Sequence, residues 1–415
     1  MREFRLKELT MKTNHLYIIV FSLFSFSFCN GQTLEDYLNI AIANNSEIKE
    51  RNLNLQLAKE KVNEVGNIDN INVFFGYFAS TPETRVGAQI TKLGVQQQLP
   101  WFGTFKAQKD VASAISDTEA YDIELSERDL LYQVKAAYYE LYQKEMVTTI
   151  LKDNKQILST YHALALSAFE NNRASMSDVI KIRVQENELH SKIFQNLNEI
   201  NALSRNFNRL LQREINTPLV ITSNLNVLDI MLTNSTVEKH PSLAKIEQLN
   251  TVYDTEYLLI NKEKLPQIGF GLDYVMVEER SDLNISDSGK DIVMPNVSLS
   301  IPVFTKKYNS KLDQIQIQKE ALISKKESQQ KQLEIALEHS SLELDNAILS
   351  VVAAHKNKEE TQLAINVDLK AYETGILDYD KILKLQLQKI IYQLREIEAT
   401  KHAFIAKAKI NYLTK

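Results

Sequence analysis

Two stretches of the chain repeat one unusual transition: QQQLPWFGTFKAQ (96–108) and SLSIPVFTKKYNSK (298–311). In each stretch, strand-like alternation reaches an apolar residue and a proline, passes an aromatic residue, and continues into polar sequence that favours a helix. The matching residues are Leu99, Pro100 and Phe102 in the first stretch, and Ile301, Pro302 and Phe304 in the second. A transition that appears twice in the same order indicates an internal repeat.

Helix-breaking residues are rare in the segments that follow both transitions. Between Gly103 and Pro218 there is neither glycine nor proline, and after Pro302 the only one is Gly375. Good helix formers dominate both segments, and apolar residues recur at spacings of three and four. A helix from Gly103 to Asn171 would be roughly 100 Å long, at about 1.5 Å per residue. Taken alone, this narrow apolar stripe favours a soluble coiled coil.

Each long helix is expected to bend back once. In the first helix, Asn171 and Asn172 interrupt the apolar stripe, and asparagine tolerates the left-handed conformation better than other non-glycine residues. In the second helix, Gly375 occupies the matching place. The sequence therefore predicts two long helical hairpins.

The remaining sequence predicts four strands in two β-hairpins, over 71–99 and 267–303. Apolar and other residues alternate along each strand, with a phase slip near Lys92. The expected hairpin tips are Ser80–Arg85 and the longer, polar Glu278–Lys290.

The two halves of the chain match in order. Asn45–Ile48 corresponds to His240–Leu243 at an offset of 195 residues, and Pro100 corresponds to Pro302 at an offset of 202. We therefore predict a duplicated unit of helix, β-hairpin and long helical hairpin. The predicted domains are a signal peptide (1–31), a first repeat (32–217, with β-hairpin 71–99 and helical hairpin 103–215), a linker (218–239) and a second repeat (240–415, with β-hairpin 267–303 and helical hairpin 305–415).

Four amphipathic strands from one chain cannot close a sheet. Open edges are a liability in water, and in lipid a sheet must close on itself. Three copies would supply twelve strands for one shared barrel and twelve helices for a continuing helical tube. Each proline would then end the strand where it turns into helix. The predicted fold class is mainly α with a small β part: duplicated helical hairpins forming an α-barrel, and four strands per chain in a trimeric twelve-stranded transmembrane β-barrel.

The N-terminal sequence and the net charge indicate where the protein acts and which partners are unsuitable. Residues 16–28 form an apolar run after Lys12, typical of an export signal, with Met11 as an alternative start and a cut expected before Gln32. Cys29, the only cysteine, could instead be a lipidated first residue of the mature chain. The net charge of −5 and the dispersed basic residues argue against nucleic-acid binding.

These features together resemble the TolC-like outer-membrane efflux proteins over about Leu34 to Leu413. The resemblance implies a homotrimer with a barrel in the outer membrane and a helical tunnel in the periplasm. Its implied partners are a periplasmic adaptor (membrane fusion) protein and an inner-membrane pump of the resistance-nodulation-division type. The sequence LPWFGTFKAQ (99–108) is similar to the matching segment of family members that serve heavy-metal or cation pumps. The implied function is a passive outer-membrane channel in a tripartite efflux system.

The resemblance also indicates site residues. In the family, a glycine followed six residues later by Asp-Val or Asp-Leu marks each helical turn; here Asn172 precedes Asp178-Val179, and Gly375 precedes Ile382-Leu383. Where well-known members carry inward aspartates, this chain has Lys381 and Lys384. The tip and gate candidates are Asn172, Asp178, Gly375, Asp378, Asp380, Lys381 and Lys384; the strand-to-helix transitions are Pro100, Trp101, Phe102, Gly103, Pro302 and Phe304.

Alternative interpretations stay open at this point. The tip charges are either solvated surface pairs or a gate in which Asp178 or Asp380 pairs with Lys381 or Lys384. Trp101 and Phe102 could form a binding platform, although the end of a strand favours a membrane interface. The same channel could serve drug efflux or type I protein secretion, or the chain could be a periplasmic coiled-coil adaptor or scaffold.

No catalytic constellation is present in the sequence. The seven histidines are scattered without metal-ligand spacing, and there is no phosphate-binding glycine loop. We therefore expect a protein that is not an enzyme, with no cofactor and no metal site of its own.

Overall fold

The computed structural model describes residues 33–221, 225–227, 230, 236–282, 284–373 and 379–414. The predicted signal peptide, with Met11 and Cys29, lies outside these residues, as do Gly375 and Asp378. Only the described residues are considered below.

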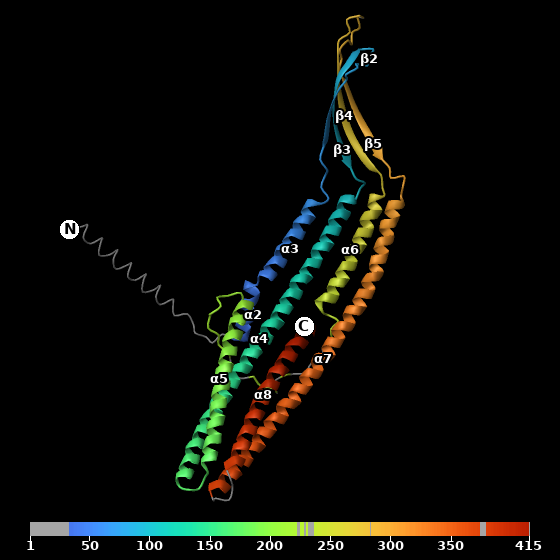
Figure 1. Cartoon of the computed structure of the whole chain (residues 1–415). Helices are drawn as coiled ribbons and strands as arrows, with labels where there is room; N and C mark the ends of the chain where they lie inside the picture. The colour runs from blue at the N-terminus through green and yellow to red at the C-terminus, as the bar shows by residue number, and fades with distance from the viewer. Residues whose placement is uncertain are drawn as a thin grey trace, which may run out of the picture. The chain divides into compact units, whose positions relative to one another are not determined.

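The chain is mainly helical with one small sheet, which confirms the coarse fold class expected from the sequence (Figure 1). No helix among the described residues combines the length and apolar content needed to cross a membrane. The helices are α2 (Leu34–Asn44), α3 (Ser46–Glu64), α4 (Thr104–Glu170), α5 (Met176–Leu210), α6 (Pro241–Glu263), α7 (Lys306–Glu373) and α8 (Tyr379–Thr414). The strands are β1 (Asn72–Tyr77), β2 (Glu83–Thr84), β3 (Gly87–Leu99), β4 (Gln267–Val277) and β5 (Ile292–Ser300).

The long helix α4 occupies the first stretch without glycine or proline, and it ends where the two asparagines begin. Asn172 has a φ of 57°, in the left-handed region that reverses the chain. Helix α5 then starts with a capping box: the side chain of Ser175 accepts from the backbone N–H of Asp178, and the Asp178 carboxylate accepts from the backbone N–H of Ser175. Local residues thus determine both sides of this turn.

The four-residue segments matched between the two halves both begin helices. Asn45 caps α3, with its side chain accepting from the backbone N–H of Ile48. His240 caps α6, with its ring accepting from the backbone N–H of Ser242, and Pro241 takes the first helical position. The first half therefore has two successive helices, α2 and α3, where the sequence predicted one.

The described residues form two compact units, and each takes segments from both halves of the chain. One unit comes from the described residues within 1–44, 131–231 and 343–408; the other comes from those within 45–130, 232–342 and 409–415. The long helices α4 and α7 contribute to both. The compact units are therefore a different division of the chain from the predicted sequence repeats.

The core of the first unit is a coiled-coil seam. Leu151, Leu158 and Ala165 recur every seven residues along α4 and are buried. They pack with buried residues of α5, α7 and α8: Val179, Ile182, Leu189, Ile193, Ile365, Tyr379, Ile382, Leu383 and Ile390. Complete burial of one such leucine or isoleucine contributes about 1.5–3 kcal/mol.

A polar layer interrupts this apolar seam. Asn154 and Gln386 are each 1% exposed, and the Gln386 amide donates to Asn154 Oδ1 over 2.7 Å. The Asn154 amide donates in turn to Gln393 Oε1 over 2.9 Å. These bonds connect α4 with α8. Because a buried amide needs its partner in register, this layer favours one alignment of the two helices.

The second unit carries the sheet, whose strands lie in the order β1-β3-β4-β5 with all pairings antiparallel. The central β3–β4 pairing joins the two hairpins, for example Leu93 opposite Tyr274. The register shifts between Gln89 and Thr91, close to the phase slip expected near Lys92. The short strand β2, which pairs with β3, lies in the segment that the sequence predicted as a hairpin tip.

Candidate functional site

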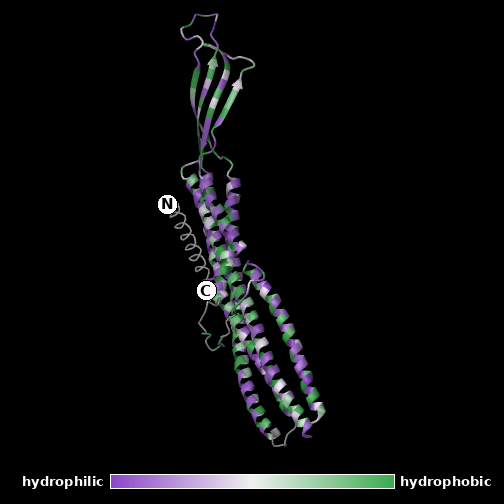
Figure 2. Cartoon of the chain, turned by 90° about the vertical axis from the view of Figure 1, so that its left-hand side faces the viewer, coloured by the Kyte–Doolittle hydropathy of each residue, from purple (hydrophilic) through white to green (hydrophobic). Residues whose placement is uncertain are grey.

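One face of the sheet is apolar and uncovered. Every second residue of each strand lies on this face, and Figure 2 shows the resulting alternation of hydrophobic and hydrophilic residues. Neighbouring cross-strand rows are Phe75, Leu93, Tyr274 and Val293, followed by Val73, Val95, Leu272 and Pro295. Phe75 is 70% exposed and Val297 is 71% exposed. A continuous apolar surface across four strands requires an apolar partner.

The opposite face of the same strands is polar. Its rows include Asn72, Gln96, Gly271 and Asn296, and then Gln98, Gly269 and Ser298. Gln96 Nε2 donates to Ser298 Oγ over 3.3 Å. Asn296 lies across Gly271, where an added Cβ would come within 2.4 Å of Asn296 Oδ1. Amide and hydroxyl groups therefore cover this end of the face and suit contact with water, and the rows nearer the hairpin tips also hold Phe74, Val275 and Met294.

Each proline of the repeated transition lies just beyond a strand. Pro100 follows the last residue of β3, and Pro302 lies two residues beyond β5. Because proline has no N–H, it can end the ladder of hydrogen bonds without leaving a donor unpaired. After Pro100 the chain turns at Gly103, whose φ of 86° favours glycine, and α4 begins at the next residue.

Aromatic side chains are exposed at both transitions. Phe102 is 79% exposed and Phe304 is 89% exposed. The rings of Trp101 and Phe102 meet edge to face, with their centroids 5.9 Å apart. Aromatic rings at the ends of strands are the arrangement that membrane barrels use at the interface between lipid and water.

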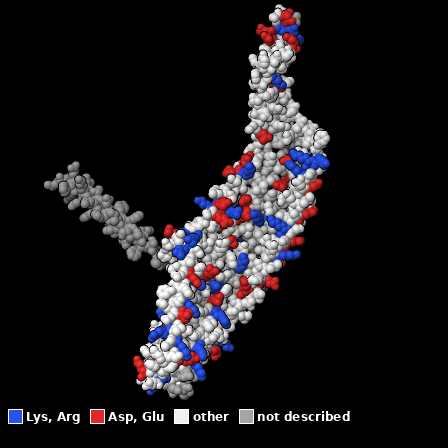
Figure 3. All heavy atoms as spheres, viewed as in Figure 1, with Lys and Arg blue, Asp and Glu red and all other residues white. Residues whose placement is uncertain are grey.

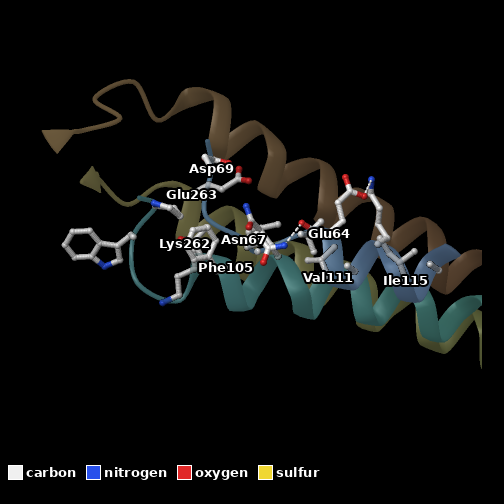
Figure 4. Close-up of a pocket in the computed structure, with 18 of the residues that line it drawn as sticks. Glu64, Asn67, Asp69, Phe105, Val111, Ile115, Lys262 and Glu263 are labelled. Atoms are coloured by element: carbon white, nitrogen blue, oxygen red, sulfur yellow. Dashed lines mark hydrogen bonds and ion pairs between the residues drawn. The ribbon is translucent and has the colours of Figure 1, made fainter. Parts of the chain in front are cut away.

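A cavity of about 950 Å³ lies where the helices of the second unit approach the strands. Figure 4 shows Glu64 from the last turn of α3, Asn67 from the segment after it, Phe105 and Val111 from α4, and Lys262 from α6 around the cavity. Its charged lining residues are Arg51, Lys61, Glu64, Asp69, Glu119, Asp122, Lys262, Glu263 and Lys307. Because both signs of charge are interspersed, the lining lacks the single-sign field that holds a charged ligand.

The helical tip of the first unit contains a small network of ion pairs. Asp380 lies 2.6 Å from Lys384 on the same helix and 3.3 Å from Lys181 on α5. Lys181 also lies 3.6 Å from Asp178. The hydrogen bond from Lys384, followed by that from Lys181, lowers the pKa of Asp380. Hydrogen bonding to Asp380 raises the pKa of Lys181. Within the described part of the tip, no ion pair includes Lys381.

The structure thus brings together only some of the tip residues selected from the sequence. Asp380 and Lys384 pair, whereas Asp178 serves mainly as the reciprocal cap of Ser175. Lys181, which links α5 to α8, was not among the candidates. The capping box has a local signal, Ser-x-x-Asp, that could have been identified in the sequence. The contact of Lys181 with Asp380 has no local signal, because it depends on how two helices pack.

Metal-ligating groups do not gather in the described residues: no cluster of three or more His, Cys, Asp or Glu side chains could hold a metal ion. What distinguishes this chain is instead a small sheet with one apolar and one polar face, joined to long helical hairpins.

No protein-family model matches the sequence, and no curated protein matches it either. Solved structures do match. CusC, studied for folding and transmembrane channel formation, has a TM-score of 0.74 at 13% identity, covering 93% of this chain and 92% of that chain. The outer membrane protein VceC of Vibrio cholerae has a TM-score of 0.68 at 12% identity, covering 92% of this chain and 95% of its own.

A third match is the open state of the MtrE outer membrane channel of Neisseria gonorrhoeae, with a TM-score of 0.69 at 13% identity. It covers 92% of this chain and 88% of that chain. Among these neighbours, CusC and MtrE are described as channels and VceC as an outer membrane protein. The chain therefore has the fold of outer-membrane channel subunits, which is the fold implied by the resemblance to the TolC-like family.

Proposed function

We propose that this protein is the outer-membrane channel of a tripartite efflux system, a passive duct formed by three copies of the chain. The observation that carries the proposal is the sheet with one apolar face and one polar face. In a closed barrel, the apolar face with Phe75 and Leu272 contacts lipid, and the polar face with Gln96 and Asn296 lines a wet pore. The likeness to solved outer-membrane channels supports the same conclusion.

The sheet edges support the trimer. β1 and β5 are the edge strands of the sheet, so each has one side unpaired within the described chain. Pairing β5 of one copy with β1 of the next closes the sheet, and three copies supply twelve of the longer strands. This count is even and lies within the range of outer-membrane barrels. A head-to-tail arrangement, in which the β5 edge of each copy meets the β1 edge of the next, also forms a closed ring without a free edge.

The partners we propose are a periplasmic adaptor protein and an inner-membrane pump of the resistance-nodulation-division type. The helices would extend into the periplasm, with the adaptor contacting their tips. There, a groove of about 550 Å³ between α5 and α8 is lined by apolar Ile180 and Val184 beside charged Lys181. Mixed apolar and charged lining suits contact with a protein surface.

The cargo we propose is small solutes. Heavy-metal cations are favoured because the sequence of residues 99–108 resembles family members that serve cation pumps. A water-filled duct needs no ligand set for its cargo, because the partner pump supplies energy and most of the selectivity. A channel for drugs or for secreted proteins would differ in the pump and not in the wall of the duct. Transport with purified pump and adaptor distinguishes these cargoes.

We propose that the ion pairs among Asp380, Lys181 and Lys384 at the helical tip hold the channel closed; we call them the closure contact. Removing one lysine from an exposed network has a small effect on stability but changes the charge at the pore mouth. We expect Lys181→Gln channels, which lose the ion pair between α5 and α8, to open more often than unmodified channels. Lys381→Gln is the matched control, because Lys381 is a lysine of the same tip that lies outside the ion pairs described there. Identical gating in both variants would contradict the closure contact.

Detergent extraction, mass measurement and planar-bilayer conductance test the whole proposal. We expect release from membranes only by detergent, a particle with the mass of three chains, and discrete conductance steps in bilayers. A periplasmic adaptor or scaffold would instead be released by salt or alkaline wash. A well-behaved monomer in plain buffer would refute the channel.

A further inference from the structure

The long strands of the sheet carry just two residues with a formal charge. Within β1, β3, β4 and β5, Lys92 and Asp273 are the only Lys, Arg, Asp or Glu. On the face shown in Figure 3, the strands form a nearly uncharged zone between the charged hairpin tips and the charged helices. The nearest charges in the tip segments are Glu83, Arg85, Glu278, Glu279, Arg280, Asp282, Asp287, Lys290 and Asp291.

These two charges lie on the polar face and pair with each other. Lys92 Nζ is 2.8 Å from Asp273 Oδ2 across the β3–β4 junction. Asn296 Nδ2 donates to the same carboxylate oxygen over 3.2 Å. The Lys92 ammonium also lies 5.6 Å from the centroid of the Phe74 ring. Neighbouring strands on both sides thus hold the pair in place, with Phe74 from β1 and Asn296 from β5.

The two partners differ in their access to solvent. The Asp273 side chain is 5% exposed, whereas the Lys92 side chain is 32% exposed. Asp273 Oδ1 is buried, and no hydrogen-bond partner for it is found among the described residues. A carboxylate buried in this way needs its cation close by. Lys92 is therefore the charge that faces the water, and Asp273 is the charge that neutralises it from within the wall.

Resting on the proposed function, we propose that the Lys92–Asp273 pair sets the ion selectivity of the strand-lined part of the duct. With the pair intact, the other side chains of these strands are uncharged, so the net charge of this segment is zero. Loss of Asp273 alone leaves one uncompensated lysine per copy, which forms a positive ring in the trimer. Loss of Lys92 alone leaves a negative ring. The specificity-determining element is thus the balance of the two charges.

Single and double substitutions test this balance by reversal potentials in a salt gradient. At low salt, we expect Asp273→Asn to favour anions and Lys92→Gln to favour cations, each changing the permeability ratio roughly three- to tenfold. The double variant should return to within about twofold of the unmodified ratio. Gln96→Ser, a neutral change on the same face, should leave the ratio unchanged.

The outcomes separate this inference from the proposed function. If the single variants conduct with an unchanged permeability ratio, the role of the Lys92–Asp273 pair in selectivity is refuted, while the proposed channel function is retained. If the unmodified protein forms no pores at all, the proposed function fails and the inference fails with it. A double variant that keeps the selectivity of either single variant also contradicts the balance.

A thiol at position 92 allows the charge to be changed after folding. Cys29 is the only cysteine of the chain, so Lys92→Cys introduces one new thiol. We expect this channel to favour cations, and a positively charged methanethiosulfonate reagent to return its permeability ratio towards that of the unmodified protein. A negatively charged reagent should shift the ratio further towards cations. If mass spectrometry shows complete modification and neither reagent moves the ratio, the proposal is wrong.

Discussion

Replacement of Leu272 by lysine is the sharpest test of where the apolar face lies. Leu272 is the middle residue of the eleven-residue strand β4, and its side chain is 50% exposed. In the proposed barrel, a strand of this length spans the hydrocarbon layer, and its middle residue lies near the centre of the bilayer. A lysine there costs about 2–4 kcal/mol per copy, and roughly three times as much per trimer.

Two matched lysine variants make the result specific. Ile268→Lys lies on the same face near the end of β4, where the cost falls to about 0–1 kcal/mol. Gln96→Lys lies on the polar face and removes only the exposed hydrogen bond to Ser298, so we expect a change within about 0.5 kcal/mol. The stabilities should therefore rank Gln96→Lys and Ile268→Lys well above Leu272→Lys.

Urea titration of trimers folded in lipid vesicles measures these differences, with heat-resistant migration on gels reporting the folded fraction. A soluble scaffold gives a different result, because replacing a half-exposed leucine with lysine in water changes stability by only about 0.5 kcal/mol. Equal midpoints for Leu272→Lys and Gln96→Lys would refute the assignment of the apolar face to lipid.

Three further predictions concern the helices. Asn154→Ala leaves the buried amide of Gln386 without its acceptor and should lower the free energy of unfolding by about 1–3 kcal/mol in urea titration; adding Gln386→Leu should recover part of this loss. Ser175→Ala removes the cap of α5 and should cost about 1 kcal/mol, seen as faster amide hydrogen exchange in its first turn. Burial, followed by the charge of Arg128, lowers the pKa of His240 from 6.5 to about 4. The folded chain therefore binds fewer protons than the unfolded chain in this range, so stability should fall by up to roughly 3 kcal/mol as the pH drops from 6.5 to 4. His240→Asn keeps a cap acceptor and should remove this loss in unfolding measured at pH 7 and pH 4.5.

Much of the fold was predictable because its signals are local. The absence of glycine and proline after Gly103 predicts a helix of the length that α4 has, and Asn172 adopts the left-handed backbone expected of the bend. Alternation in the strands predicts which side chains share a face, since successive residues point to opposite sides. The phase slip near Lys92 likewise corresponds to the register shift in β3. Each of these signals depends on a few neighbouring residues.

What the tertiary structure alone decided is which distant residues meet. Alternation predicts two hairpins but not the β3–β4 pairing that joins them, and without that pairing Lys92 and Asp273 are two unrelated charges. Helical periodicity likewise predicts α5 and α8 but not the contact of Lys181 with Asp380. Backbone conformation responds to adjacent side chains, whereas the pairing of separated charges depends on strand register and helix packing. Those are set by the whole set of buried contacts, which no short stretch of sequence contains.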